Sequence, residues 1–334
     1  MPLSNIFHLI LTLRNRYYDS HSERILHSNM PVISIGNLSV GGSGKTPMVI
    51  EFCDIMKTLG YAPCVVGRGY KRKGRGIQLV SDGENILTNA TTGGDEMVLI
   101  AKNAKVPVIA GDSKSKVVRA IDAGEFPISP NCIIVDDGFQ HRQLYRNLDI
   151  VLVDKNTLKR PYLLPKGRLR EPFSSLKRAD AIILTKGATQ AELNAIYPTE
   201  KPVFTATYGL SEPYSLFQNM SVDATDVVAV TGIANPSVFV DMLRDTGVNV
   251  VDTMAYSDHH SYAEQDIAKI IARRSVIATT EKDAVKLEAF SDVFISNNIN
   301  VLVYPLSVSI SSGMAELLEL IMGKCEKPPP KDGN

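Results

Sequence analysis

One segment of the sequence has the residue types that bind phosphate groups. Residues 36–47 read GNLSVGGSGKTP, follow the apolar run 32–35 and lead into a helical pattern over 46–59. Glycines permit a tight turn whose backbone N–H groups point at phosphate oxygens, and the helix that follows adds partial positive charge. Lys45 would reach the β- and γ-phosphates, and the Thr46 hydroxyl would bind Mg²⁺. Ser39 stands where the P-loop motif has its first glycine. The predicted nucleotide-binding residues are Ser39, Val40, Gly41, Gly42, Ser43, Gly44, Lys45 and Thr46.

A second segment supplies the carboxylates that a nucleotide-bound metal ion needs. The apolar run 132–135 ends in Asp136 and Asp137. A carboxylate at the end of such a strand can hold Mg²⁺ directly or through water. Two buried neighbouring carboxylates without a cation would repel each other. Glu96 is a further candidate, so the predicted metal ligands are Thr46, Glu96, Asp136 and Asp137.

Two other polar segments each allow a catalytic and a structural interpretation. Asp95 opens a helical pattern after Gly93 and Gly94, where it is either a helix cap or a base exposed in a cleft. The Asp258-His259-His260 segment follows a predicted strand and is either a surface loop or a partner for a carboxylate across the cleft. Residues 280–286 follow another strand and are typical of a capped helix start.

These segments lie among elements that alternate between strand and helix. Apolar strands are predicted at 32–35, 62–66, 106–109, 132–135, 149–153 and 181–184, and a second series runs from 227 to 303. Fully apolar strands between helices predict an α/β fold, with mainly parallel sheets covered on both faces. The length of 334 residues favours two three-layer domains. We expect a P-loop nucleotide-binding domain over 1–220 that includes the N-terminal helix, a smaller α/β domain over 221–326 that closes over the cleft, and a flexible tail over 327–334.

Composition excludes some function classes. Lys and Arg number 36, as do Asp and Glu, and Trp is absent, so a polybasic nucleic-acid binder is not expected. The charge is nevertheless uneven, because five of the eight residues 68–75 are basic and residues 155–178 hold eight basic residues and one acidic residue. The four cysteines lie in or beside apolar runs, which predicts buried thiols.

The N-terminal segment predicts an amphipathic helix. Apolar residues recur at helical spacing, and the remaining positions are polar or basic; the apolar set is Ile6, Leu9, Ile10, Leu13 and Tyr17. No apolar run approaches the roughly 18 residues of a membrane-spanning helix. Such a helix either packs on its own domain or lies in a membrane interface beside anionic head groups.

Taken in order, the motifs resemble those of the tetraacyldisaccharide 4′-kinase family over nearly the whole chain. The matching segments are 36–47, Gly67-Arg68-Gly69-Tyr70, Gly94-Asp95-Glu96, 136–141 (DDGFQH), 164–172 (LPKGRLREP), 230–236 (VTGIANP), Asp258-His259-His260 and 280–283 (TEKD). Each motif alone is weak evidence for the family, whereas the whole set in this order is specific for it. The family also lacks the first glycine of the P-loop motif.

The resemblance implies ATP- and Mg²⁺-dependent phosphorylation of the 4′-hydroxyl of an acylated glucosamine disaccharide 1-phosphate, a late step of lipid A biosynthesis. It implies a peripheral enzyme on the cytoplasmic face of the inner membrane, and neither a nucleic acid nor an obligate protein partner is expected. The catalytic residues would be Asp95 as base, His259 as its assistant, and Lys45, with His260 ranked second to His259. The candidate substrate-binding residues are Arg68, Gln140, His141, Arg168 and Arg170.

Three other functions are weighed against this one. A P-loop GTPase switch would need a guanine-reading Asp where Thr185-Lys186-Gly187 is followed by Ala188. A kinase of a soluble acceptor would need neither the basic segments nor the N-terminal helix. A degenerate nucleotide-binding scaffold fits poorly, because Lys45, Thr46 and both aspartates are intact.

Overall fold

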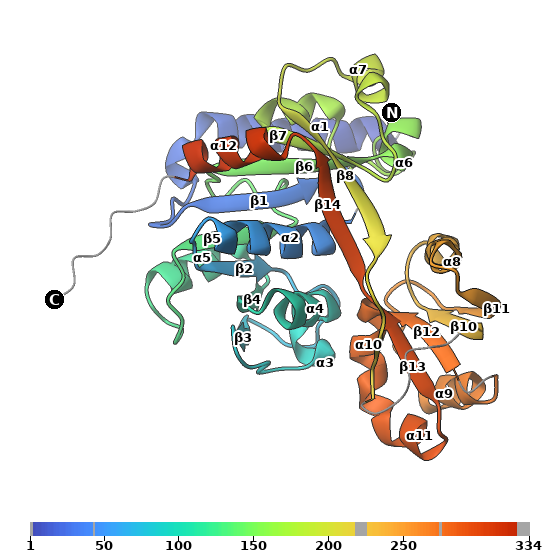
Figure 1. Ribbon diagram of the computed structural model, residues 1–334. Helices are drawn as coiled ribbons and strands as arrows, with labels where there is room; N and C mark the ends of the chain where they lie inside the picture. The colour runs from blue at the N-terminus through green and yellow to red at the C-terminus, as the bar shows by residue number, and fades with distance from the viewer. Residues whose placement is uncertain (1–2, 43, 218–225, 274–275, 326–334) are drawn as a thin grey trace. The chain divides into compact units, whose positions relative to one another are not determined.

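The computed structural model describes residues 3–42, 44–217, 226–273 and 276–325 (Figure 1). The chain divides into two compact units, the first formed by 1–207 with 308–334 and the second by 208–307. It leaves the first unit within strand β8 (Val203–Leu210) and returns within β14 (Leu306–Ser312). This division differs from the predicted one, because the chain segment after 307 belongs to the first unit. Residue 220, the predicted boundary, and the tail 327–334 lie outside the described residues.

The first unit is built on a nine-stranded sheet with the order β14-β8-β7-β6-β1-β5-β2-β4-β3. Strand β1 (Val32–Asn37) pairs in parallel with β5 (Cys132–Asp136) and with β6 (Leu148–Asp154). The other strands are β2 (Pro63–Gly67), β3 (Ile77–Asp82), β4 (Pro107–Gly111) and β7 (Ala181–Thr185). Strand β3 at one end of the sheet pairs antiparallel with β4. Every residue of β1, β2, β5, β6 and β7 is buried, as expected for a parallel sheet with both faces covered.

Helices follow the strands of the first unit. Helix α2 (Lys45–Thr58) begins directly after Gly44, which has a φ of +85°. Buried side chains of α2, among them Met48, Phe52 and Met56, contribute to the core. Helix α4 (Asp95–Ala104) packs beside α2. The remaining helices are α1 (Leu3–Ser20), α3 (Ala90–Gly93), α5 (Lys114–Asp122), α6 (Lys155–Lys159), α7 (Gln190–Ile196) and α12 (Met314–Lys324), with short 3-10 turns at Ser22–Arg24 and Phe173–Arg178. The four cysteines are buried and unpaired, as predicted.

The second unit contains a five-stranded sheet with the order β11-β10-β12-β13-β9, parallel except for β9. The strands are β9 (Tyr214–Ser215), β10 (Asp226–Thr231), β11 (Asn249–Ala255), β12 (Val276–Thr280) and β13 (Asn300–Tyr304), and the helices are α8 (Pro236–Asp245), α9 (Glu264–Ile271), α10 (Glu281–Leu287) and α11 (Ser291–Ser296). On β10, Val228 and Val230 pack with residues of α9, α10 and α11, whereas Val227 and Ala229 pack with α8. Helices therefore cover both faces of this sheet. The predicted α/β fold with mainly parallel sheets is confirmed.

Helix α1 contacts the first unit through its polar side. Arg14 forms an ion pair of 2.8 Å with Glu171, which is fully buried, and Arg142 donates to the backbone carbonyl of Asn15 at 2.8 Å. Leu11 is the one buried residue among positions 6–20 of this helix. The predicted apolar stripe faces outward instead, with exposed fractions of 38–58% at Ile6, Leu9, Ile10, Leu13 and Tyr17.

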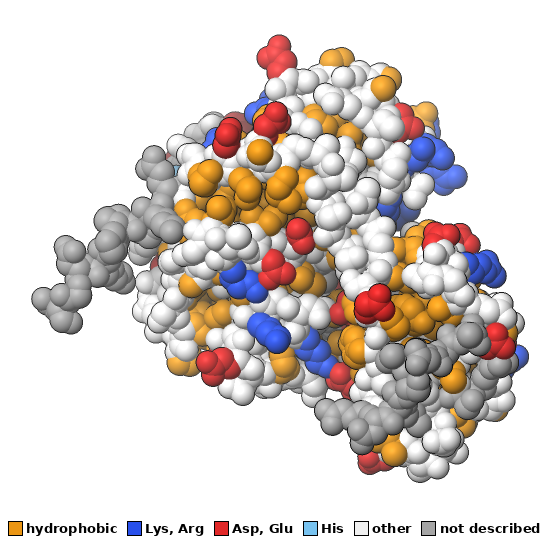
Figure 2. Space-filling model, viewed as in Figure 1, with side chains coloured by type: hydrophobic (Ala, Val, Ile, Leu, Met, Phe, Trp, Pro, Cys, Tyr) orange, Lys and Arg blue, Asp and Glu red, His pale blue; other side chains and the backbone are white. Residues whose placement is uncertain are grey.

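No helix in the described part of the chain has both the length and the apolar character needed to cross a bilayer. Basic and acidic side chains are interspersed on the face of the molecule seen in Figure 2, and no continuous basic surface is visible there.

Candidate active site

The P-loop lies between the end of β1 and the start of α2. Gly41 and Gly44 have φ of +103° and +85°, a region that favours glycine, so the loop needs glycine at these positions. Ser39 has no such backbone angle, and its hydroxyl lies 2.9 Å from that of Thr157 on α6. A serine therefore fits where the motif usually has its first glycine. Ser43, one of the predicted nucleotide-binding residues, lies outside the described residues.

The two neighbouring aspartates have different surroundings. The register of β1 and β5 places Asp136 opposite Ile35, one residue before the P-loop segment. The carboxylate of Asp137 forms a bidentate pair with Arg170, at 2.7 and 2.8 Å, and lies 3.6 Å from Lys45 Nζ. Burial alone would raise the pKa of Asp137, but the charges of Lys45 and Arg170 outweigh burial and hold it below its ordinary value.

Asp136 instead has the surroundings of a carboxylate that a cation would stabilise. Burial, Glu96 and Asp137 raise its pKa to about 7, and its Oδ1 is a buried oxygen with no hydrogen-bond partner. A buried charge of this kind is costly unless it is paired or bound to a metal. The chemistry of Asp136, with Thr46 at the start of α2, therefore fits a divalent cation. No group of three or more His, Cys, Asp and Glu side chains that could hold a metal is found among the described residues. The four predicted ligands thus do not form a preassembled cage, since Asp137 pairs with Arg170.

Basic side chains hold the outer edge of the P-loop. Residues 38–40 pair with the segment 168–171, through a bridge between Ser39 and Leu169 and through Val40 N–H donating to the carbonyl of Arg168. The Arg168 guanidinium donates to the carbonyl of Val40 at 2.8 Å and lies over Gly41, where an added Cβ would collide with it. Lys186, directly after β7, donates to the carbonyl of Gly42.

Lys186 and one further lysine were missed by the sequence analysis as members of this site. Lys114 is buried at the start of α5 and donates to the backbone carbonyl of Asp137 at 2.9 Å, and burial lowers its pKa. No local pattern marks Lys114. The Thr-Lys-Gly sequence after β7 was the available signal for Lys186, and it was considered only as a guanine motif.

Asp95 begins α4 at a turn made of closely packed glycines. The residue is 8% exposed, and its Oδ1 accepts the N–H of Glu96 at 3.0 Å. An added Cβ on Gly94 would lie 2.8 Å from the Cα of Gly69, so the Gly67-Arg-Gly-Tyr segment contacts the Gly93-Gly94 turn directly. An added Cβ on Gly67 would lie 3.7 Å from Cβ of Asp136. Both glycine motifs thus let the ends of β2, β5 and α4 approach one another.

The predicted substrate-binding residues occupy different positions. Arg168 and Arg170 lie at the P-loop as described, and Gln140 donates to the backbone carbonyl of Asn37 at 2.7 Å. Arg68 is exposed. The Nε2 of His141 accepts the N–H of Ser115 at 3.2 Å, and burial together with Lys114 and Arg146 lowers the pKa of His141 to about 4. His141 is therefore neutral, and it supports the loop after β5.

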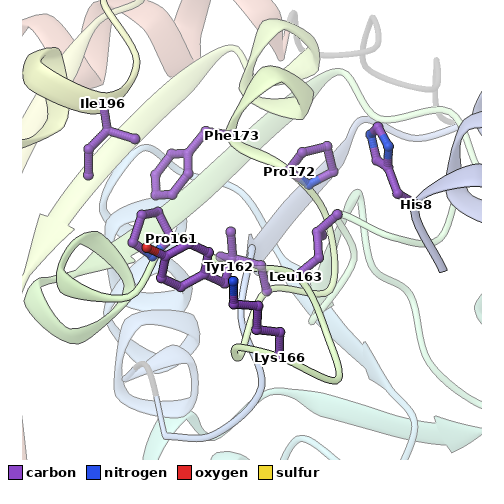
Figure 3. Close-up of a pocket in the computed structure, with 9 residues that line it drawn as sticks. His8, Pro161, Tyr162, Leu163, Lys166, Pro172, Phe173 and Ile196 are labelled. Atoms are coloured by element: carbon purple, nitrogen blue, oxygen red, sulfur yellow. The ribbon is translucent and has the colours of Figure 1, made fainter. Parts of the chain in front are cut away.

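A cavity of about 550 Å³ lies in the first unit beside the segment that pairs with the P-loop (Figure 3). Apolar side chains form most of its lining, and Lys166 and His8 are the cationic or titratable members; the apolar set is Pro161, Tyr162, Leu163, Leu169, Pro172, Phe173 and Ile196. The Lys166 ammonium lies over the Tyr162 ring, 4.9 Å from its centre. His8 belongs to α1, so the cavity connects this helix with the neighbourhood of the P-loop.

Three predicted motifs of the second unit meet at one edge of its sheet. Asp283 on α10 is fully buried, and its Oδ2 accepts from the Thr231 hydroxyl at 3.1 Å and from Gly232 N–H at 2.9 Å. The Thr280 hydroxyl donates to the same oxygen at 2.9 Å. Lys286 pairs with Asp283 at 3.0 Å and donates to the carbonyl of His260 at 3.1 Å. Asp283 therefore holds together the ends of β10 and β12 and, through Lys286, the Asp-His-His loop.

The two histidines of that loop have different partners. His260 lies 3.0 Å from Asp266 and stacks on Tyr256, so its ring is fixed within the second unit. The Nε2 of His259 lies 3.2 Å from Lys282 Nζ. The backbone of His259 has a φ of +59°, and its backbone N–H donates to the carbonyl of Gly232. His259 belongs to the second unit and Asp95 to the first, and their pairing stays a prediction.

The central strand β1, its glycine-rich turn into α2 and the carboxylates at the end of β5 define a P-loop phosphotransferase fold. A profile of the tetraacyldisaccharide-1-P 4′-kinase family matches residues 1–324. The chain belongs to this family of kinases.

Individual relatives agree with that assignment. A tetraacyldisaccharide 4′-kinase of Chlorobium phaeobacteroides is 37% identical over 306 residues, which cover 86% of this chain and 85% of the relative. One of Syntrophus aciditrophicus is 38% identical over 308 residues, covering 83% and 80%. The crystal structure of LpxK from Aquifex aeolicus in complex with ATP superposes with a TM-score of 0.77 at 32% identity, covering 97% of this chain and 98% of the other.

Proposed function

We propose that this kinase uses ATP and Mg²⁺ to phosphorylate the 4′-hydroxyl of a tetraacylated glucosamine disaccharide 1-phosphate at the cytoplasmic face of the inner membrane. The observation that carries the proposal is the arrangement of Lys45, Arg170 and Lys114 around Asp136 and Asp137 at the start of α2. Such a site combines phosphate-binding N–H groups and cations with the Asp136 carboxylate, whose buried Oδ1 has no hydrogen-bond partner. The family membership supports this acceptor.

Phosphoryl transfer depends mainly on positioning and on neutralisation of charge. The backbone of 40–46 and Lys45 would bind the phosphates of ATP. Thr46 and Asp136 would hold Mg²⁺, with Glu96 close enough to raise the pKa of Asp136. The ion would neutralise charge on the β- and γ-phosphates. Asp137 would keep Lys45 and Arg170 in place rather than bind the metal itself.

Asp95 would accept the proton of the 4′-hydroxyl, and His259 would orient the Asp95 carboxylate. A carboxylate at the N-terminus of α4 benefits from the helix dipole and is held by the N–H of Glu96. Because the two residues come from different units, their pairing would require closure of the enzyme, which would also exclude water and limit ATP hydrolysis.

Two features of the first unit suit a lipid acceptor. The cavity beside the P-loop segment combines apolar side chains with Lys166 and His8, which suits an anionic, partly apolar molecule. Helix α1 turns its apolar stripe outward, which suits an interfacial helix better than a packing helix.

The reaction is tested with the full-length chain, ATP labelled at the γ-phosphate and the tetraacyldisaccharide 1-phosphate in mixed micelles. We expect label in the lipid as a 4′-monophosphate ester, dependence on Mg²⁺, and loss of both ATP binding and transfer in Lys45→Ala. Hydrolysis without lipid labelling, or better transfer from GTP than from ATP, would contradict the proposal.

The role of α1 is tested by flotation with anionic phospholipid vesicles. Each large apolar side chain contributes about 1.5–3 kcal/mol when it leaves water, so Leu9→Ser combined with Leu13→Ser should reduce vesicle binding at least tenfold. Its thermal midpoint should not change, because both side chains are exposed. Leu11→Ala is the matched control, with the opposite expectation of a lower midpoint and unchanged flotation. Undiminished flotation of the double variant would exclude the stripe as the membrane contact.

A further inference from the structure

We propose that Lys282 is a positioning residue that fixes which ring nitrogen of His259 carries the proton. The inference rests on the role proposed above for His259 and assigns the chemistry of that role. The contacts that carry it lie entirely within the second unit.

Helix α10 holds the Asp258–His260 loop with two lysines that are one turn apart. Lys286 Nζ donates to the carbonyl of His260 at 3.1 Å. Lys282 Nζ lies 3.2 Å from His259 Nε2 and 3.4 Å from Asp258 Oδ1. Residues four apart on a helix point to the same side, so one helix face contacts both halves of the loop.

The chemistry of an ammonium group determines the direction of the contact with the ring. A lysine ammonium has three donors and no acceptor, so Nε2 of His259 must accept, and the single proton of the neutral ring lies on Nδ1. The Asp258 carboxylate lies 3.9 Å from Nε2 and 3.4 Å from the Lys282 ammonium, so it pairs with the lysine.

The other charged groups at this edge are engaged elsewhere. Asp266 contacts Nε2 of His260 and the N–H of Ala263, both at 3.0 Å. Asp283 accepts from Thr231, Gly232 and Thr280 and pairs with Lys286. In the described part of the second unit, Lys282 at 3.2 Å and Asp258 at 3.9 Å bring opposite charges to Nε2 of His259. His259 would act as an Nδ1–H donor that orients a carboxylate, and it would not act as a second base.

The tautomer is measured directly in the full-length protein with ¹⁵N-labelled histidine, with His259→Gln used to assign the signals. Long-range correlations between ring nitrogens and ring protons distinguish a protonated from an unprotonated nitrogen. In the unaltered protein at neutral pH we expect a proton on Nδ1 and none on Nε2 of His259. Lys282→Met should move the proton toward Nε2, Lys282→Arg should retain the original pattern, and Lys269→Met, an exposed lysine on α9, should have no effect. A proton on Nε2 in the unaltered protein, or an unchanged pattern in Lys282→Met, would overturn the proposal.

Turnover separates this proposal from the proposed function. We expect Lys282→Met to lower kcat about tenfold with KM for ATP unchanged, and Lys282→Arg to stay within about threefold of the original. If His259→Gln lowers kcat and Lys282→Met does not, only the positioning role is overturned. If His259→Gln turns over normally, the role of His259 is wrong, and the part of Lys282 in turnover is overturned with it.

Discussion

Asp136 and Asp137 follow each other in sequence and differ in what surrounds each carboxylate. Arg170 and Lys45 stabilise the charge of Asp137, whereas burial, Glu96 and Asp137 itself disfavour the charge of Asp136. A strand end thus supplies one carboxylate that fixes cations of the protein and one that is suited to an added cation. Sequence alone assigned the two the same role, because the arginine that distinguishes them lies 33 residues away.

Asp95→Asn distinguishes a catalytic base from a helix cap. Asparagine retains the oxygen that accepts the N–H of Glu96, so the fold and ATP affinity should change little. It cannot accept a proton from the sugar hydroxyl, so kcat should fall at least about 100-fold. The measurements are lipid phosphorylation, ATP binding by calorimetry and the thermal midpoint. Normal turnover would identify Asp95 as a cap only.

The lowered pKa of His141 makes folding sensitive to mild acid. Its pKa is about 4 in the folded protein and near 6.5 in an unfolded chain, so between these values the unfolded chain binds the extra proton. This contribution to the free energy of unfolding is complete above about pH 6.5 and is lost as the pH falls toward 4. His141→Gln keeps an acceptor for Ser115 N–H but has no group that titrates in this range. Its free energy of unfolding should therefore fall on acidification by about 1–3 kcal/mol less than that of the unaltered protein.

Urea unfolding of the unaltered protein and of His141→Gln at pH 7.5 and pH 4.5 checks this expectation. Carboxylates also titrate in this range, so the informative quantity is the difference in the free energy of unfolding between the two proteins. A difference that is the same at both pH values would show that His141 does not contribute.

At the level of elements, the glycine contact between the β2 and α4 ends sets the position of Asp95. Gly94 has φ of +92° and lies against Gly69, so Gly94→Ala should both strain the backbone and push the two segments apart. We expect kcat to fall at least about tenfold. Gly124→Ala is the matched control, because Gly124 has φ of +70° but an added Cβ there would meet nothing within 4 Å. Equal turnover in the two variants would show that the contact does not position Asp95.

The buried strands of the active-site sheet were predicted because continuous apolar runs mark them. Strands β3, β8 and β14 of the same sheet are only partly buried and were missed, whereas the partly exposed β11 was predicted. Strand β14 alternates buried Val308 and Ile310 with exposed residues and has no continuous apolar run. Helix α1 was predicted with its apolar stripe, but the choice between packing and exposure depended on Glu171, which no local pattern marks as its partner.

The site was predictable to the extent that it follows from local motifs. Lys45 and Thr46 lie at the start of α2 and Asp136 at the end of β5, each beside diagnostic neighbours. Lys114, Lys186 and the pairing of Arg170 with Asp137 depend on contacts between segments far apart in the chain. Such contacts follow from the strand order, which a single sequence does not specify.

At the level of the whole molecule, the first unit depends on a segment that comes after the second unit. Leu317 and Ile321 of α12 are fully buried, and Lys324 pairs with Asp180 at 2.8 Å. Removal of residues 308–334 should therefore destabilise the first unit by several kcal/mol, at about 1.5–3 kcal/mol for each of the two side chains. The core of the second unit, which is drawn from 208–307, should persist.

Hydrogen–deuterium exchange of the truncated chain measures both effects. We expect faster exchange in β7 and in the 203–207 part of β8, and unchanged protection in β10 and β12. Retained protection throughout the first unit would contradict the structural role of the returning segment.

This return of the chain has a consequence for biosynthesis. When a ribosome has completed β7, it has not yet made β14 and α12, which complete the first unit. All of the second unit is made before these two elements. In the nascent first unit, the apolar surface that Leu317 and Ile321 later cover therefore stays exposed. The order of synthesis therefore favours folding of the second unit before the first unit is complete.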